Sequence, residues 1–194
     1  MDSLKKEVIL QKKEEFMKKI LIISTSPRKG GNSDTLAHEF ERGACEAGHE
    51  VEFINLCDRT IAFCRGCLTC GKTNRCVIKD DANAIVEKMH DADVVVWATP
   101  IYYYSVSGQM KTMIDRGNPL YDTDYRFTET YLIATAAEDE AEVVNGAKTA
   151  LQGWVDCFER LSFKGTVFAG GVNNRGDIAN HPALAEAYEM GCKA

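Results

Sequence analysis

The chain of 194 residues lacks several features that would assign it at once to a large class of protein. No apolar run approaches the roughly 18 residues that a membrane-spanning helix needs. Positive charge is not in excess either: 23 basic residues stand against 29 acidic ones, and a net charge of −6 disfavours a nucleic-acid partner. The first sixteen residues are charged and contain no apolar signal-peptide core. We therefore expect a cytoplasmic protein with neither membrane nor nucleic acid as partner.

Two nucleotide-binding motifs are also absent. The sequence contains neither G-x-G-x-x-G nor G-x-x-x-x-G-K-[ST] after its first apolar run, so dinucleotide and triphosphate sites are poor fits. It contains no internal repeat and no linker, and its length suits one domain. Because MKKILIISTSP, from Met17, reads like a natural start, we expect residues 1–16 to be an N-terminal extension and residues 17–194 to be the domain.

Short apolar segments alternate with amphipathic ones along the domain. The expected strands are Ile20–Ser24, Val51–Leu56, Asp93–Pro100, Tyr131–Ala137 and Thr166–Val172. The expected helices are Asp34–Ala47, Asp81–His90, Gly108–Arg116, Ala141–Leu161 and Ala183–Gly191. This alternation predicts an α/β fold, a three-layer α/β/α sandwich around a five-stranded parallel sheet. The economical strand order is 2-1-3-4-5, as in flavodoxin-like folds.

The segment after the first strand, STSPRKGGNS, is rich in hydrogen-bond donors and precedes a helix. Ligands of such sheets bind at the carboxyl ends of the strands, and a helix N-terminus favours an anion. The alternative is an ordinary polar turn that ends in a helix cap. We favour a single terminal phosphate, with these residues as candidate ligands: Ser24, Ser26, Arg28, Asn32, Ser33 and Thr35.

The segment after the third strand, TPIYYYSVSGQMK, places three consecutive tyrosines at the same edge of the sheet. Aromatic rings provide stacking surfaces for a flat ligand, although a tyrosine-rich surface can equally contact another subunit. After the fourth strand, TAAED offers small residues that let the backbone approach a ligand. The candidate residues of these two loops are Pro100, Ile101, Tyr102, Tyr103, Tyr104, Ser105, Thr135 and Ala136.

Together, STSPRKGGNS and ATPIYYYSVSGQMKTMIDR resemble the NADPH-dependent FMN reductase family of flavodoxin-like proteins, over most of the chain from Met17. The resemblance implies that the residues of the first loop hold the phosphate of FMN. It implies that Pro100 to Tyr104 line the isoalloxazine ring, and that Thr135–Ala137 face its pyrimidine edge. It also implies NAD(P)H as co-substrate and a homodimer or homotetramer.

Four of the eight cysteines lie in CRGCLTCGKTNRC: Cys64, Cys67, Cys70 and Cys76. This segment resembles that of the iron–sulfur flavoproteins of the same family, in which it implies the ligands of a [4Fe–4S] cluster. Zinc is disfavoured, because its paired C-x-x-C motifs are usually about 15–20 residues apart. Disulfides and free thiols remain open alternatives, the former disfavoured by a reducing compartment.

The sequence thus predicts an FMN-dependent NAD(P)H oxidoreductase that passes electrons to a small-molecule acceptor. The cysteine segment raises an alternative, an electron carrier with FMN and a cluster that serves protein partners. A flavin-free domain on the same fold is a third hypothesis, which the tyrosines disfavour. Prompt reduction of the flavin by NAD(P)H would distinguish the first hypothesis from the second.

Overall fold

The computed structural model describes residues 17–194, so the expected N-terminal extension, residues 1–16, lies outside the described residues. Five parallel strands form one sheet in the order β2-β1-β3-β4-β5. Their bounds are β1 (Lys19–Ser24), β2 (Glu50–Asn55), β3 (Val94–Pro100), β4 (Glu129–Thr135) and β5 (Ser162–Ala169). The predicted fold class and strand order are confirmed.

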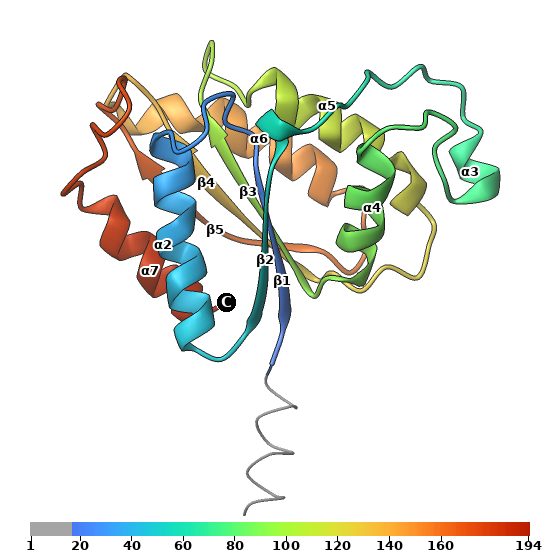
Figure 1. Cartoon of the computed structure of the whole chain (residues 1–194), viewed down its shortest axis with the longest axis horizontal. Helices are drawn as coiled ribbons and strands as arrows, with labels where there is room; N and C mark the ends of the chain where they lie inside the picture. Colours follow the sequence, from blue (N-terminus) through green and yellow to red (C-terminus); the bar gives the residue numbers. More distant parts are fainter. Residues whose placement is uncertain (1–16) are drawn as a thin grey trace, which may run out of the picture.

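Helices cover both faces of the sheet (Figure 1). One core lies between the sheet and helices α2 (Asn32–Glu46) and α7 (Ala183–Cys192). The other lies between the sheet and helices α4 (Ala82–Asp91), α5 (Gly108–Arg116) and α6 (Asn145–Val155). The short helix α3 and three 3₁₀ turns complete the elements: α3 (Cys70–Thr73), η1 (Leu56–Asp58), η2 (Asn118–Leu120) and η3 (Ala141–Val144). Within residues 17–194, no helix is long and apolar enough to cross a membrane.

Strand β3 explains why the sheet needs two helical layers. All seven of its residues are buried, and successive side chains point to opposite faces. Val94 and Val96 belong to the core under α2 and α7, whereas Val95 and Trp97 belong to the core under α4, α5 and α6. An apolar run without alternation is therefore what a strand buried on both faces requires.

Helices α2 and α7 cross in close contact, which fixes the position of α2 above the sheet. A Cβ atom at Gly43 would lie 2.1 Å from the Tyr188 carbonyl oxygen, and one at Gly191 would lie 2.1 Å from the Phe40 carbonyl oxygen. The contact therefore requires glycine on both helices. It holds the C-terminal half of α2 against α7.

The predicted long helix over Ala141–Leu161 is wrong. The segment begins as the 3₁₀ turn η3, continues as α6 and ends at Val155 in a series of turns. These turns bury Phe158 and Leu161 in the core, where Phe158 packs edge-on against Trp154, with ring centroids 5.2 Å apart. Burial of these side chains outweighs continuation of the helix.

Candidate functional site

A buried carboxylate organises the loop after β1. Asp34, on the first turn of α2, accepts hydrogen bonds from the Gly30 N–H at 2.7 Å and from the Asn55 side-chain amide at 2.9 and 2.8 Å. The Ser24 hydroxyl also donates to it. Sequence reasoning expected Asp34 only at the start of a helix. Its side chain instead joins the loop to β1 and β2.

The N-terminus of α2 presents free donors to this loop. The first hydrogen bond of the helix runs from the Thr35 N–H to the Gly31 oxygen, at 3.0 Å. Among the residues that the structure describes, the N–H groups of Asn32, Ser33 and Asp34 have no acceptor, although all three residues are buried. Buried N–H groups are normally paired, and at a helix N-terminus the fitting partner is an anion. A terminal phosphate fits this position.

The side chains predicted to bind the phosphate are mostly engaged within the protein. The Ser26 hydroxyl donates to the Arg28 carbonyl oxygen at 2.9 Å, and the Thr35 hydroxyl donates to the Gly31 oxygen at 3.2 Å. The Asn32 amide donates to the Asn174 oxygen at 2.8 Å. Their role as ligands stays a prediction, because hydroxyl groups can rotate towards a bound anion. The backbone of α2 is the better-supported donor set.

Two arginine side chains lie at the loop after β1. The sequence predicted a role for only one of them. The Arg28 guanidinium donates to the Asn173 oxygen at 3.2 Å. Arg175 reaches the loop from beyond β5, and its Nε donates to the Gly30 oxygen at 3.0 Å. Both side chains are exposed, so they place positive charge at the mouth of the anion site. No motif signals Arg175, because it lies far along the chain.

The three tyrosines form a tight hairpin, residues 102–105, called here the tyrosine hairpin. The N–H groups of Tyr102 and Ser105 donate to each other's carbonyl oxygens at 3.0 and 3.1 Å. Tyr103 and Tyr104 adopt left-handed conformations, with φ of 48° and 60°. Such turns favour Asn-Gly, and left-handed aromatic residues are rare. The backbone is therefore strained at Tyr103 and Tyr104, beyond the carboxyl end of β3. Backbone strain of this kind is common at functional sites.

The tyrosine hairpin is exposed but anchored. Tyr103 is fully exposed, whereas Pro100 and Ile101, before the hairpin, are buried. The Tyr104 hydroxyl donates to the Glu138 carboxylate at 2.7 Å, and this hydrogen bond raises the pKa of Tyr104. The hairpin is thus joined to the loop after β4 by a side-chain hydrogen bond.

The loop after β4 offers backbone donors slightly beyond the predicted residues. The hydroxyl groups of Thr135 and Ser33 form a hydrogen bond of 2.6 Å. The Ala136 N–H donates to the Ala169 oxygen at 3.0 Å. In the described part of the chain, the N–H groups of residues 137–139 have no acceptor, and these residues are exposed. A ligand edge with acceptor atoms would find its donors there.

The four cysteines of the motif line one cavity of about 680 Å³ between the cysteine segment, residues 64–76, and helices α5 and α6. Cys70 is buried, and its sulfur accepts a hydrogen bond from the Asn118 amide at 2.9 Å. Hydrogen bonds from Thr69 lower the pKa of the exposed Cys67. The cavity also includes Cys157, which sequence reasoning did not connect with the motif.

The donor set fits a thiolate-bound metal centre in type and number, but the sulfurs do not converge. Within residues 17–194, no group of three or more Cys, His, Asp or Glu residues is placed to hold a metal ion. No cysteine of that range is in a disulfide. The structure therefore gathers four thiols around one cavity, with their sulfurs apart from one another.

Comparison with known proteins identifies the family. Residues 18–161 match the family described as NADPH-dependent FMN reductase. The chain belongs to this family. A Bacillus subtilis protein described as an NAD(P)H-dependent FMN-containing oxidoreductase is 30% identical over 89% of this chain and 96% of its own. The predicted family is thereby confirmed, and its description names NADPH and FMN, the co-substrate and the cofactor that the sequence predicted.

Relatives named iron–sulfur flavoprotein match a shorter part of the chain. One from Methanocaldococcus jannaschii is 40% identical over 53% of each chain, so this chain spans about half the length of the curated relatives of that name. Solved structures support the fold: an NAD(P)H:quinone oxidoreductase from Methanothermobacter marburgensis has a TM-score of 0.72 at 16% identity, covering 91% of this chain and 96% of its own. An FMN-dependent NADH-azoreductase from Bacillus anthracis, in complex with FMN, has a TM-score of 0.65 at 16% identity, covering 90% and 98%.

Proposed function

We propose that this chain binds FMN at the carboxyl ends of the strands, between the loop after β1, the tyrosine hairpin and the loop after β4, and acts as an NAD(P)H-dependent reductase. The observation that carries the proposal is the set of unpaired N–H groups of three buried residues, Asn32, Ser33 and Asp34. They fit the phosphate of a mononucleotide, because a helix dipole and three free donors favour an anion there. Arg28 and Arg175 add positive charge at the mouth.

The remaining residues position the flat part of the cofactor. Tyr102 and its neighbours would supply aromatic surface for the ring, and the free N–H groups of residues 137–139 would donate to acceptor atoms at its edge. When bound, FMN supplies the hydride and electron chemistry between a nicotinamide and a second acceptor. Backbone donors at the edge favour negative charge that develops there, so no side chain has to act as a general acid or base.

The test of this function is anaerobic reduction of the holoprotein. Protein loaded with FMN is mixed with NADPH, and in parallel with NADH, while the visible absorbance of the flavin is followed. A reductase loses this absorbance promptly with at least one nicotinamide. A holoprotein that dithionite bleaches but neither nicotinamide does would contradict the proposal.

The second candidate function is that of an electron carrier with FMN and a [4Fe–4S] cluster. It is favoured by the cavity around which Cys64, Cys67, Cys70 and Cys76 gather, and by the names of several relatives. Its test is the iron and acid-labile sulfide content of protein purified without oxygen. About four of each per chain would support the carrier, whereas flavin absorbance without iron would reject it.

We further propose a homodimer or homotetramer in the cytoplasm, with a small molecule as electron acceptor. The exposed tyrosine hairpin supports assembly, because three exposed aromatic residues beside a proposed ligand site suit a contact with a second subunit. Light scattering of the purified holoprotein measures the mass. A monomer at micromolar concentration would contradict this part of the proposal.

A further inference from the structure

The cysteine segment enters and leaves the domain through two chain stems that lie side by side, residues 60–62 and residues 78–82. The Thr60 N–H donates to the Asp81 carboxylate at 2.7 Å, and the Asp81 N–H donates back to the Thr60 oxygen at 3.2 Å. The Ala62 N–H donates to the Asp80 carboxylate at 2.9 Å. Two side-chain carboxylates of one stem therefore accept hydrogen bonds from backbone N–H groups of the other, and one backbone–backbone hydrogen bond joins the stems as well.

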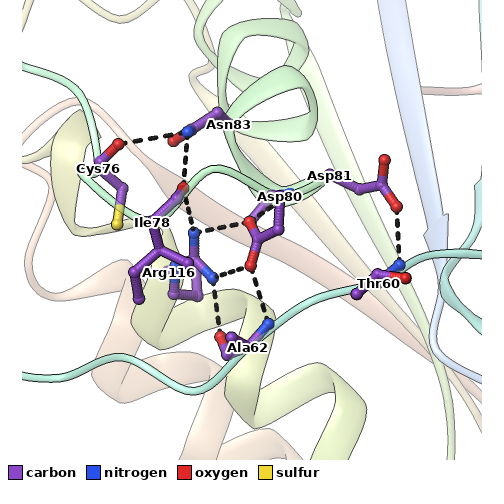
Figure 2. A network of polar contacts seen from close by, with 9 residues as sticks. Thr60, Ala62, Cys76, Ile78, Asp80, Asp81, Asn83 and Arg116 are labelled. Carbon is purple, nitrogen blue, oxygen red and sulfur yellow. Dashed lines mark hydrogen bonds and ion pairs between the residues drawn. The ribbon is translucent and has the colours of Figure 1, made fainter.

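Arg116, the last residue of α5, fastens these stems to the domain (Figure 2). Its Nη1 donates to the Ala62 oxygen at 2.7 Å and to Asp80 at 2.6 Å, and its Nη2 donates to Asp80 at 2.8 Å. One planar guanidinium thus contacts both stems at once. A planar fork of donors can do this, whereas the point charge of a lysine cannot.

The burial of this contact is unusual for a surface loop. The Arg116 side chain is 0% exposed and that of Asp80 is 7% exposed. Burying an ion pair has a large desolvation cost, and apolar side chains of similar volume often stabilise a fold as well. A contribution to stability therefore does not explain why this ion pair is buried. The need to hold a segment in one place explains it, because such placement requires directional hydrogen bonds.

One donor of Arg116 remains unused: among the described residues its buried Nε has no hydrogen-bond partner. Asn83 holds the end of the cysteine segment through its backbone. Its side-chain amide donates to the Cys76 oxygen at 3.2 Å and to the Ile78 oxygen at 2.9 Å. Cys76 is thus held by its backbone in the neighbourhood of Arg116.

We propose that Arg116 is a positioning residue. It holds the two stems of the cysteine segment together against α5 and so keeps Cys70 and Cys76 at the wall of the cavity. This role applies to a segment with free thiols as well as to one that carries a metal centre. It does not depend on the reductase activity, and its test does not measure that activity.

The test is site-resolved alkylation of the reduced, anaerobic full-length holoprotein with iodoacetamide, read by peptide mass spectrometry. Two variants release the segment: Arg116→Lys, which keeps the charge but loses the fork, and Asn83→Ala, which removes the two bonds to the backbone. The control is Arg126→Lys, because Arg126 forms a similar but exposed fork with Asp93. Cys45, on the remote helix α2, is the internal reference.

We expect alkylation of Cys70 and Cys76 to rise about tenfold in Arg116→Lys and severalfold in Asn83→Ala, relative to Cys45. The melting temperature of Arg116→Lys should stay close to that of the wild type, since a lysine can still pair with Asp80. Unchanged relative rates in both variants would overturn the proposal. So would an equal rise at Cys45, because it would mean that Arg116 supports the whole fold.

Discussion

Gly146 offers a sharp test of how the tyrosine hairpin is held. It lies in the first turn of α6, and a Cβ atom there would be 1.9 Å from the Tyr104 carbonyl oxygen. The hairpin would have to move by about 1 Å or more to relieve this contact. Overpacking of this kind costs about 1–3 kcal/mol, whereas alanine favours a helix over glycine by about 1 kcal/mol. We therefore expect Gly146→Ala to lower the free energy of unfolding by about 0–2 kcal/mol.

The effect on FMN should be larger than the effect on stability. A displacement of about 1 Å at a positioning loop can reduce function by roughly tenfold to a hundredfold, so we expect FMN affinity to fall by that order. Quenching of FMN fluorescence measures the affinity, and urea unfolding measures the stability of the apoprotein.

Gly153, on the same helix, is the matched control, because an added Cβ there would meet nothing within 4 Å. Gly153→Ala should gain up to about 1 kcal/mol and bind FMN as the wild type does. If Gly146→Ala binds FMN as tightly as this control, the placement of the tyrosine hairpin beside the cofactor is wrong.

Three further predictions concern other parts of the chain. Asp34→Ala leaves the Gly30 N–H and the Asn55 amide without their acceptor, so urea unfolding should report a loss of about 1–3 kcal/mol with weaker FMN binding; unchanged values would contradict the organising role of Asp34. Burial, with the nearby charge of Lys18, lowers the pKa of His49 from its ordinary value of 6.5. Its contribution to stability should therefore be complete above pH 6.5 and be lost as the pH falls through the folded-state pKa, and His49→Asn should flatten this dependence in urea unfolding between pH 7.5 and pH 5; an identical slope would contradict it. If the purified protein contains iron, Cys64→Ser should remove the iron and leave FMN bound; iron retained at the wild-type level would exclude Cys64 as a ligand.

The regular elements were predictable because their patterns are local. β3 is apolar throughout, as a strand buried on both faces must be, and α5 matches its expected bounds, Gly108–Arg116. The long helix predicted over Ala141–Leu161 failed because a periodic apolar pattern cannot distinguish one helix from a helix followed by turns. The turns form there because Phe158 packs against Trp154 of α6 and against Phe127, which precedes β4 and is distant in the sequence.

The candidate site could be predicted from the sequence at the level of loops rather than of atoms. The donors after β1 and the tyrosines after β3 could be located, because the carboxyl ends of parallel strands share one edge of the sheet. The engagement of Asn32 with Asn174, 142 residues away, could not be predicted, and neither could the approach of Arg175 to Gly30. Contacts between distant loops depend on the assembled fold, and no local pattern encodes them.

The cysteine segment shows the same limit. Its spacing indicated one thiol-rich site, and the structure places all four thiols around one cavity. Nothing in the sequence pairs Asp80 with Arg116, which lie 36 residues apart and belong to different elements. Yet this buried pair decides how the segment is held. Buried charges are costly unless paired, so the pairing could be recognised only once both were seen to be buried.

The most direct test of the central claim, that the N-terminus of α2 holds the phosphate of FMN, compares FMN with riboflavin. The two ligands share the ring system and differ in the phosphate. Titration of the apoprotein with each, under the same conditions, should give an affinity for FMN that is roughly a hundredfold higher or more, since two or three hydrogen bonds to a charged group are lost with riboflavin. Equal affinities for the two ligands would contradict the account.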